Sequence, residues 1–528
     1  MSRDATHGRR VLSMAGGTAA SRLTGLLRVL VLAWVLGFTP LADAFNLANT
    51  IPNMLFDLVI GGVLSATFIP VVVERLALDG ERRAWRSIST VVTATVGVLA
   101  VASLAAWWLA PHIITGFTFL QHAHTTNETV ALRAQRRVAT ELLRWFVPQI
   151  FFYGVIGVAT ALLNVRRRFG IGSWAPVANN IVCIAVLVWF HLVDPTPSVT
   201  SVAGGSALVW LGLGTTAGVA VQFVIMWPAL VTSDLGRLRL HFEWRDPALR
   251  SMARLGSWTL LVVIANQVSL YVVLAFAFAT GGGGPVSAYT YGWSFMQMPY
   301  AVVVVSVLGV LTPQLAELAT AGDYRVMSER LRFGLRQSLV IIIPCTVALL
   351  ILAQPIVGIL LNHLNASVPL PAGTVLAILA AGLPGFTVFQ LCVRGLQAMQ
   401  RAPDVFGLYA LQNAATIVLC VFLGRHSLAG LTASVSLAYA AAAVVALVVM
   451  GARHVPIAST LWGIHVRRSV VASLAMGTVM AAAWATPTWT RGAGLLARGL
   501  LASGLGVLTY VLFVLVAQRG SEPSPRKM

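Results

Sequence analysis

Residues 11–38 read VLSMAGGTAASRLTGLLRVLVLAWVLGF. The run is long enough to cross a bilayer, because a membrane helix needs about 20 predominantly apolar residues. It nevertheless contains Arg22 and Arg28, although a charge at the centre of a membrane helix costs about 2.5–3.5 kcal/mol on insertion scales. Charged groups at that depth usually face a wet cavity or one another. The stretch therefore predicts a membrane helix whose two arginines have a partner.

The composition extends this interpretation to the whole chain. Of the 528 residues, 58% are hydrophobic and 10% are charged, whereas a soluble domain is about half apolar and about a quarter charged. The net charge of +19 reflects 36 basic and 17 acidic residues. Because most arginines cluster in short loops, we interpret them as topology signals and expect no nucleic-acid partner. The cysteines lie far apart in apolar runs, as buried hydrophobic residues do: Cys183, Cys345, Cys392 and Cys420.

The spacing of the apolar runs predicts an all-α polytopic membrane protein with about 14 transmembrane helices. The expected spans are 11–38, 41–73, 88–110, 139–164, 172–193, 204–232, 255–280, 286–315, 335–361, 372–397, 404–423, 427–451, 469–487 and 496–517. We expect the first run to be retained as a span and not removed as a signal peptide. With the N-terminus in the cytoplasm, the large majority of the basic residues fall on the cytoplasmic side, as the positive-inside rule requires. Both termini are therefore predicted to be cytoplasmic.

A repeated motif predicts two lobes. FIPVVVERLALDG (68–80) and LTPQLAELATAGD (311–323) share a proline, a glutamate, Leu-Ala and an acidic end, and each closes the second span of a six-span unit. Internal repeats of this kind are typical of transporters. The expected organisation is an N-terminal lobe (1–232, spans 1–6), a cytoplasmic inter-lobe loop (233–254), a C-terminal lobe (255–451, spans 7–12), two additional C-terminal spans (452–517) and a cytoplasmic tail (518–528).

The sequence indicates a transporter and not an enzyme. It has no Walker A, HExxH or GxSxG motif, so we expect no catalytic residues and no cofactor. His122 and His124 are weak evidence for a metal ion, and we expect no metal site. The glycines at 281–284 are interpreted as an outer turn. Without an ATP motif, an unidentified ion gradient or the membrane potential is the expected energy source, the potential supplying about 2.3 kcal/mol per unit charge per 100 mV.

The segment ALRAQRRVATELLRW (131–145) contains four arginines and lies on the side of the membrane predicted to be outside. The segment suits either an amphipathic helix on the outer surface or a helical extension of the fourth span with a solvated face. The second interpretation is preferred.

The first two spans also contain two carboxylates, Asp43 and Asp57. On a straight helix Arg22 and Arg28 lie about 120° apart, and Gly25 between them would permit a bend. Guanidinium groups suit bidentate contacts with phosphate, which favours an anionic headgroup as substrate. Salt bridges from the arginines to the carboxylates would instead only tie the two spans together. The residues leave both interpretations open.

Several stretches carry a resemblance to a known family. They are SRLTGLLRVLVLAWVLG (21–37), ADAFNLANTIPNMLFDLVIGGVLSATFIPVVVE (42–74), ALLNVRRRFGIGSWAPVANN (161–180) and FMQMPYAVVVVSVLGVLTPQLAE (295–317). Together they resemble the MurJ/MviN lipid II flippases, a family in a superfamily of two-lobed exporters that includes drug antiporters. The resemblance implies that the substrate is lipid II, the diphosphate-linked peptidoglycan precursor. It would pass from the inner to the outer leaflet of the bacterial cytoplasmic membrane by alternating access, for cell-wall synthesis and cell shape.

The resemblance also implies roles for particular residues. Arg22 and Arg28 match arginines of a central cavity thought to bind the diphosphate, and Asp43 matches an acidic position near the outer end of span 2. Spans 469–487 and 496–517 match a groove thought to hold the polyprenyl tail. Asn53 and Asp57 are further candidates for lining or gating the cavity.

The chain departs from the family pattern at three positions. Many members have an arginine where this chain has Phe56, another where it has Ser294, and a glutamate where it has Gln297. Ser294 and Gln297 stay candidates for the cavity or its gate. The departures leave only two cavity arginines matched.

Three alternatives remain open. A drug or ion antiporter of the same superfamily would use Asp57 as its deep carboxylate. A non-transporting scaffold for cell-wall synthesis is favoured by the departures at Phe56 and Ser294. An integral-membrane enzyme is the weakest, because no carboxylate pair or metal-ligand cluster is evident. For the flippase, the expected partners are lipid II, membrane lipids, and proteins of cell-wall synthesis and division.

Overall fold

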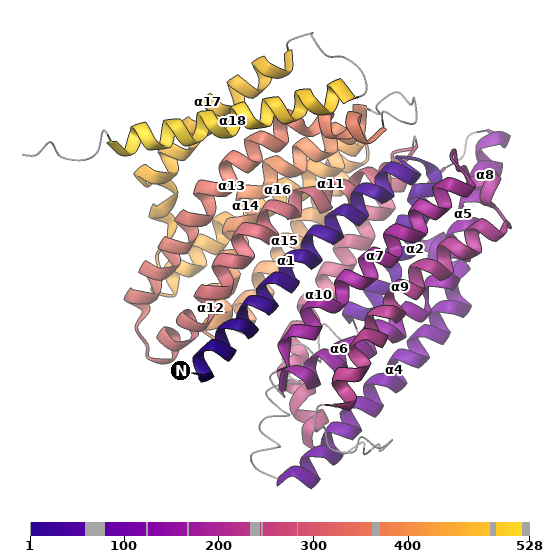
Figure 1. Ribbon diagram of the computed structural model, residues 1–528, viewed down its shortest axis with the longest axis horizontal. Helices are drawn as coiled ribbons and strands as arrows, with labels where there is room; N and C mark the ends of the chain where they lie inside the picture. The colour runs from indigo at the N-terminus through magenta and orange to yellow at the C-terminus, as the bar shows by residue number, and fades with distance from the viewer. Residues whose placement is uncertain are drawn as a thin grey trace, which may run out of the picture. The chain divides into compact units, whose positions relative to one another are not determined.

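The computed structural model describes residues 2–58, 80–122, 125–165, 168–232, 243, 247–281, 283–361, 370–485 and 493–519 (Figure 1). The regular elements of these residues are all helical, which confirms the expected all-α class. By internal packing the chain divides into two compact units, Met1–Ser287 and Ala288–Met528. The boundary falls near the start of α11 (Pro285–Pro299), so this helix begins in the first unit and continues into the second. The two-lobe division at 233–254 stays a prediction.

The helices described in the first unit are long, with one exception. They are α1 (Ser2–Leu36), α2 (Pro40–Phe56), α4 (Gly80–Phe117), α5 (Thr126–Phe146), α6 (Pro148–Val165), α7 (Phe169–Val193), the short α8 (Val199–Val202), α9 (Ser206–Val231) and α10 (Pro247–Ala279). Within this unit α1 packs along α7, α2 packs against α5, and α7 and α6 both pack against α9.

The second unit continues from α11 through a π turn, η2 (Tyr300–Val304), that directly follows Pro299. Proline has no N–H to donate, so the regular helical hydrogen-bond pattern is interrupted there. The other elements are α12 (Val305–Thr320), α13 (Tyr324–Leu361), α14 (Leu370–Ala398), α15 (Ala402–Leu419), η4 (Cys420–Gly424), α16 (Leu428–Ala452), η5 (Ala458–Trp462), α17 (Ile464–Ala485) and α18 (Ala493–Arg519). Here α14 packs against α13 and α16, and α17 packs against α18 and α13.

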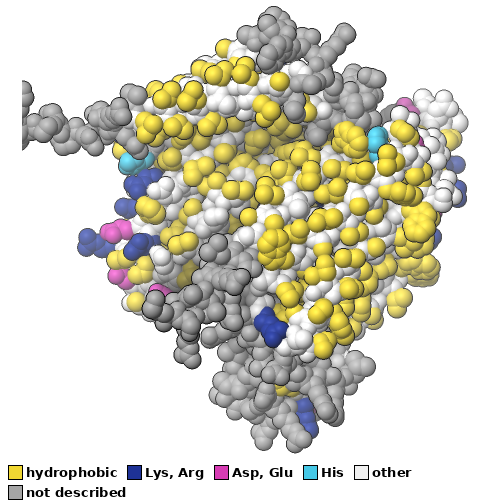
Figure 2. All heavy atoms as spheres, in the orientation of Figure 1, with side chains coloured by type: hydrophobic (Ala, Val, Ile, Leu, Met, Phe, Trp, Pro, Cys, Tyr) yellow, Lys and Arg dark blue, Asp and Glu magenta, His cyan; other side chains and the backbone are white. Residues whose placement is uncertain are grey.

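The described residues contain 13 stretches long and apolar enough to cross a membrane. They correspond to the expected spans with the exception of the second, 41–73. That span begins as α2, and its residues 59–73 lie outside the described part of the chain. On the face drawn in Figure 2, hydrophobic side chains cover the helices, and most of the charged side chains in view lie toward the margins. This distribution is the one expected when lipid surrounds the helices.

The arginine-rich segment 131–145 belongs to α5, a helix with one buried face. Its N-terminus has a capping box, in which Thr125 accepts from the Glu128 amide and Glu128 accepts from the Thr125 amide. Pro148 begins the next helix, and Val147 separates it from α5. The segment therefore leads into span 4 as a helical extension, the interpretation preferred from the sequence, with an interruption of one residue at Val147. It packs against α2, α4 and α9, with Arg133, Arg137 and Arg144 exposed and Arg136 half-buried.

Candidate functional site

Helix α1 holds the two arginines on one continuous α-helix, which does not unwind at Gly25. Its position is set by Asn180 of α7, whose Nδ2 donates to the Ser21 carbonyl at 3.2 Å and to the Thr24 hydroxyl at 3.1 Å. A Cβ at Gly25 would lie 3.6 Å from the Asn180 Nδ2, an ordinary van der Waals contact, so this approach does not require glycine. The hydrogen bonds from Asn180 to Ser21 and Thr24 therefore help to fix the register of α1 on α7 just before Arg28.

Arg28 is half-buried and points toward polar atoms of neighbouring helices. Its guanidinium contacts the sulfur of Cys183 on α7 and lies near the hydroxyl of Tyr153 on α6. The Tyr153 ring also packs against Phe56, with ring centroids 5.5 Å apart. Phe56, one of the positions where the chain departs from the family pattern, thus shares a neighbour with Arg28. Arg22, by contrast, is exposed.

Asp57 and Asn53 lie at the end of α2 and are both half-buried. The Asp57 Oδ2 accepts a hydrogen bond from Gln267 Nε2 of α10 at 3.2 Å. Asn53 donates to the Asn49 carbonyl of its own helix at 2.7 Å. Asp57 therefore has a neutral donor as its partner.

Asp43 is buried, with 2% of its surface exposed, near the start of α2. Its Oδ1 accepts from both the backbone amide and the hydroxyl of Ser287, each at 2.7 Å. The Ser287 hydroxyl in turn accepts from Asn46 Nδ2 at 3.1 Å. Because α11 begins at Pro285, the carboxylate sits at a helix N-terminus, where unpaired amides and the helix dipole stabilise a negative charge.

The glycine turn before α11 brings the chain close enough for this contact. Gly284 has φ +79°, and a Cβ there would overlap the backbone of Phe38, just before α2. Helix α2 itself is capped by Thr39, whose side chain accepts from the Ala42 amide at 3.2 Å. Glycine at 284 therefore lets the outer turn predicted from the sequence pack against the start of α2.

Among the described residues, neither Arg22 nor Arg28 forms a salt bridge with Asp43 or Asp57. The ion pairs found there involve Arg325, Arg401 and Arg453. Asp43 and Asp57 are instead hydrogen-bonded by Ser287 and Gln267, as described above. Within the described part of the chain, Arg28 lies near the thiol of Cys183 and the phenol of Tyr153.

Ser294 and Gln297 lie on the part of α11 that belongs to the second unit, and both are half-buried. The Ser294 hydroxyl donates to the Thr290 carbonyl of its own helix at 2.9 Å. Trp293, which directly precedes Ser294, packs against Phe386 and Tyr439, at centroid distances of 5.9 and 6.2 Å. The candidate residues are thus divided between the two units.

Three contact residues were missed by sequence reasoning: Ser287, Gln267 and Tyr153. None is charged, and each lies far along the chain from its partner, so charge and local spacing did not reveal them. The start of a helix at Gly-Pro was the one available signal for Ser287. Among the described residues no group of three or more His, Cys, Asp or Glu side chains could hold a metal ion. His124 lies outside the described residues.

Comparison with known proteins gives consistent matches. The family model described as lipid II flippase MurJ matches residues 32–497, a segment that begins after both arginines. A lipid II flippase MurJ of Burkholderia cenocepacia is 27% identical over 443 residues, covering 81% of this chain and 80% of that protein. A probable lipid II flippase MurJ of Vibrio cholerae is 25% identical over 517 residues, 94% of each chain.

Solved structures show the same fold. A lipid II flippase MurJ in an inward closed conformation matches with a TM-score of 0.74 and 18% identity, over 96% of this chain and 99% of that one. An inward-facing multidrug transporter of the MATE family matches with a TM-score of 0.66 and 13% identity, over 84% of this chain and 96% of that one. At these identities the structural matches establish a common architecture.

Proposed function

The chain belongs to the MurJ family of lipid II flippases, and from that premise we propose that it carries lipid II from the inner to the outer leaflet of the bacterial cytoplasmic membrane. It is a multi-pass membrane transporter that works by alternating access, with both termini in the cytoplasm. Its product at the outer leaflet is the precursor for peptidoglycan synthesis.

The observation that carries the site assignment is the environment of Arg28. The guanidinium is half-buried on α1 beside Cys183 and Tyr153 and forms no ion pair within the described part of the chain. A cation in a membrane protein without a carboxylate partner favours an anionic ligand. The planar guanidinium fork matches the oxygens of a diphosphate. Arg28 and the exposed Arg22 are therefore assigned to the headgroup.

Asp43 is assigned to the gate. Its two short hydrogen bonds to Ser287 tie α2 to the start of α11 in this conformation. Opening of the transporter at this end would separate them. Asn53 and Asp57 on α2, and Ser294 and Gln297 on α11, remain candidates for the cavity wall.

The polyprenyl tail and the energy source complete the proposal. Helices α17 and α18 carry many exposed apolar side chains, among them Leu474, Leu500 and Val507. Such faces suit a polyprenyl chain in contact with lipid. An ion gradient or the membrane potential supplies the driving force, and proteins of cell-wall synthesis and division are proposed as partners.

The test is an assay of lipid II accessibility at the outer leaflet, in cells depleted of this protein and supplied with variants. We expect Arg28→Ala to lower outer-leaflet lipid II about tenfold or more, the effect of losing one hydrogen bond to a charged group. Arg28→Lys keeps the charge but loses the bidentate geometry, so we expect an intermediate result. Arg22→Ala tests the second arginine.

Arg425→Ala is the matched control, because Arg425 is exposed and lies in the second unit. It should leave lipid II accessibility unchanged. Normal accessibility in both Arg22→Ala and Arg28→Ala, at normal protein levels, would contradict the site assignment. Growth without any transport of lipid II in the complemented cells would indicate the scaffold instead.

A further inference from the structure

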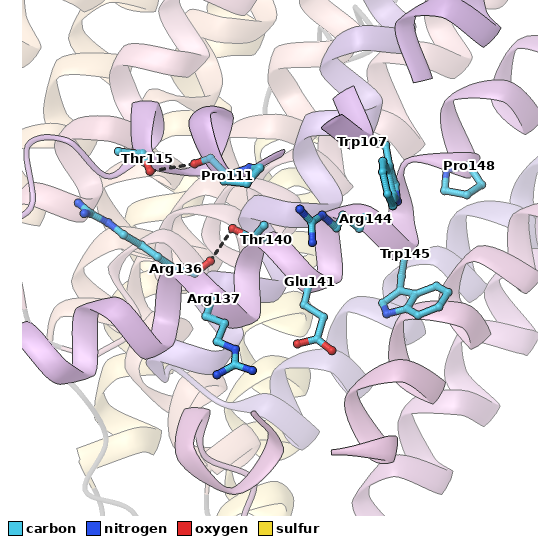
Figure 3. A pocket seen from close by; sticks show the side chains of 10 residues that line it. All are labelled: Trp107, Pro111, Thr115, Arg136, Arg137, Thr140, Glu141, Arg144, Trp145 and Pro148. Carbon is cyan, nitrogen blue, oxygen red and sulfur yellow. Dashed lines mark hydrogen bonds between the residues drawn. The ribbon is translucent and has the colours of Figure 1, made fainter. Parts of the chain in front are cut away.

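A cavity of about 770 Å³ opens on the first unit where α4, α5 and α6 meet (Figure 3). Its lining combines three arginines, one glutamate and two tryptophans with smaller side chains: Trp107, Pro111, Thr115, Arg136, Arg137, Thr140, Glu141, Arg144, Trp145 and Pro148. It shares no residue with the site proposed for lipid II. On the predicted topology this end of the unit faces outward.

The three arginines of the cavity are held differently. Arg136 is fixed to the end of α4, since its Nε donates to the Thr118 hydroxyl and its Nη2 to the Thr118 carbonyl, both at 2.8 Å. Arg144 lies over the Trp107 ring, 5.4 Å from the centroid. Arg137 is exposed and, among the described residues, forms no ion pair with Glu141 one turn away.

Arg137 and Arg144 can act on one ligand. Seven residues separate them, which places both on the same face of α5 and about 10 Å apart along its axis. Figure 3 shows Arg144 beside Trp107, with Arg137 and Glu141 projecting from α5 nearby. The lining carries more positive than negative charge, so the cavity favours an anion.

An apolar track leads along α4 to the same cavity. Val98, Val101 and Leu104 are 54, 67 and 71% exposed. Their spacing of three residues turns each position about 60° around the helix from the one before, so they form an inclined row that leads to Trp107. The track from Val98 to Trp107 spans about 13 Å. Tryptophan is typical of the membrane–water interface, where a lipid's acyl chains meet its headgroup.

We propose that this cavity binds the phosphate headgroup of an anionic phospholipid, with an acyl chain lying along Val98, Val101 and Leu104. Arg137 and Arg144 bind the phosphate oxygens, and Trp107 positions Arg144 at the interface. Basic pockets between membrane helices recognise anionic headgroups in this way. On the predicted topology the lipid belongs to the outer leaflet.

The test uses the full-length protein in lipid nanodiscs that contain a photoreactive phosphatidylglycerol. Cross-links should map to α4 and α5, and unlabelled phosphatidylglycerol should displace the probe better than phosphatidylcholine. We expect the affinity to fall about fivefold for each arginine removed, and about 25-fold in Arg137→Gln/Arg144→Gln. Glu141→Gln should raise it about fivefold, because it removes the opposing charge. Arg133→Gln is the matched control, since Arg133 is exposed on the same helix but does not line the cavity.

The opposite signs expected for the arginine and glutamate variants distinguish recognition from loss of folding, which would lower the affinity in both. Equal cross-linking in the wild type and the double arginine variant would overturn the proposal. So would displacement by phosphatidylcholine as effective as by phosphatidylglycerol. Displacement by inorganic phosphate as effective as by the lipid would assign the cavity to free phosphate and overturn the assignment to a lipid.

Discussion

Replacing Asp43 by Asn isolates the charge that holds α2 to the start of α11. Asparagine has nearly the same shape and keeps an Oδ1 acceptor, so the packing around this buried position is preserved. What it loses is the negative charge that now accepts two hydrogen bonds from Ser287, both at 2.7 Å. The variant therefore tests whether the carboxylate keeps this contact closed.

The size of the effect follows from the two hydrogen bonds. A hydrogen bond to a charged group contributes about 1.5–3 kcal/mol, and a neutral one about 0.5–1.5 kcal/mol. The substitution thus weakens each bond by about 1 kcal/mol and the contact by about 2 kcal/mol. An equilibrium between closed and open forms of the contact would shift about 30-fold toward the open form.

Hydrogen exchange of the Ser287 amide measures this equilibrium directly, because that amide donates to Asp43. We expect peptides that contain Ser287 to exchange about 30-fold faster in Asp43→Asn, since exchange follows the population of the open form. Asp57→Asn is the matched control: Asp57 has Gln267 as its partner, so the Ser287 amide should exchange as in the wild type. An unchanged exchange rate in Asp43→Asn would refute the role of the charge.

Two further substitutions test the turns and the second unit. Gly284→Ala should speed hydrogen exchange at the start of α11 by more than Gly281→Ala does. Both positions have positive φ, where a side chain costs about 1–3 kcal/mol. Only a Cβ at Gly284 would also overlap Phe38. Asp404→Asn should lower the free energy of unfolding by about 1 kcal/mol in chemical denaturation, with a smaller effect at high salt. The reason is that it weakens a partly exposed ion pair, in which Arg453 donates to both carboxylate oxygens of Asp404 at 2.9 and 3.0 Å. An Asp404→Asn effect that does not depend on salt would contradict this explanation.

The membrane helices were predictable because their signal is local. A run of about 20 apolar residues predicts a span without knowledge of its neighbours. The same reasoning did not find the break at Val147 that separates α5 from α6. Pro148 was a local signal for this break, because proline disfavours a helical conformation of the preceding residue. A long-range contact lies there as well, since the Thr216 hydroxyl donates to the Trp145 carbonyl at 2.7 Å. Local patterns carry no information on such a partner.

The candidate site was predictable in its charges and not in its contacts. Arg28, Asp43 and Asp57 stand out in the sequence because a charge inside an apolar run demands an explanation. Their partners do not stand out, because serine, glutamine and tyrosine are uncharged and lie far along the chain. Ser287 is 244 residues from Asp43, and Gln267 is 210 residues from Asp57.

The identity of those partners bears on how the arginines work. If Asp43 or Asp57 neutralised Arg28, an anionic headgroup would have to displace a carboxylate before it could bind. Because both carboxylates accept hydrogen bonds from neutral donors in this conformation, the proposed binding of a diphosphate at Arg28 would not require an ion pair to break. The proposed gate contact at Asp43 and the proposed headgroup site at Arg28 then rely on separate partners. A substitution at one should leave the hydrogen bonds of the other intact, and this independence is what makes the two roles separable by experiment.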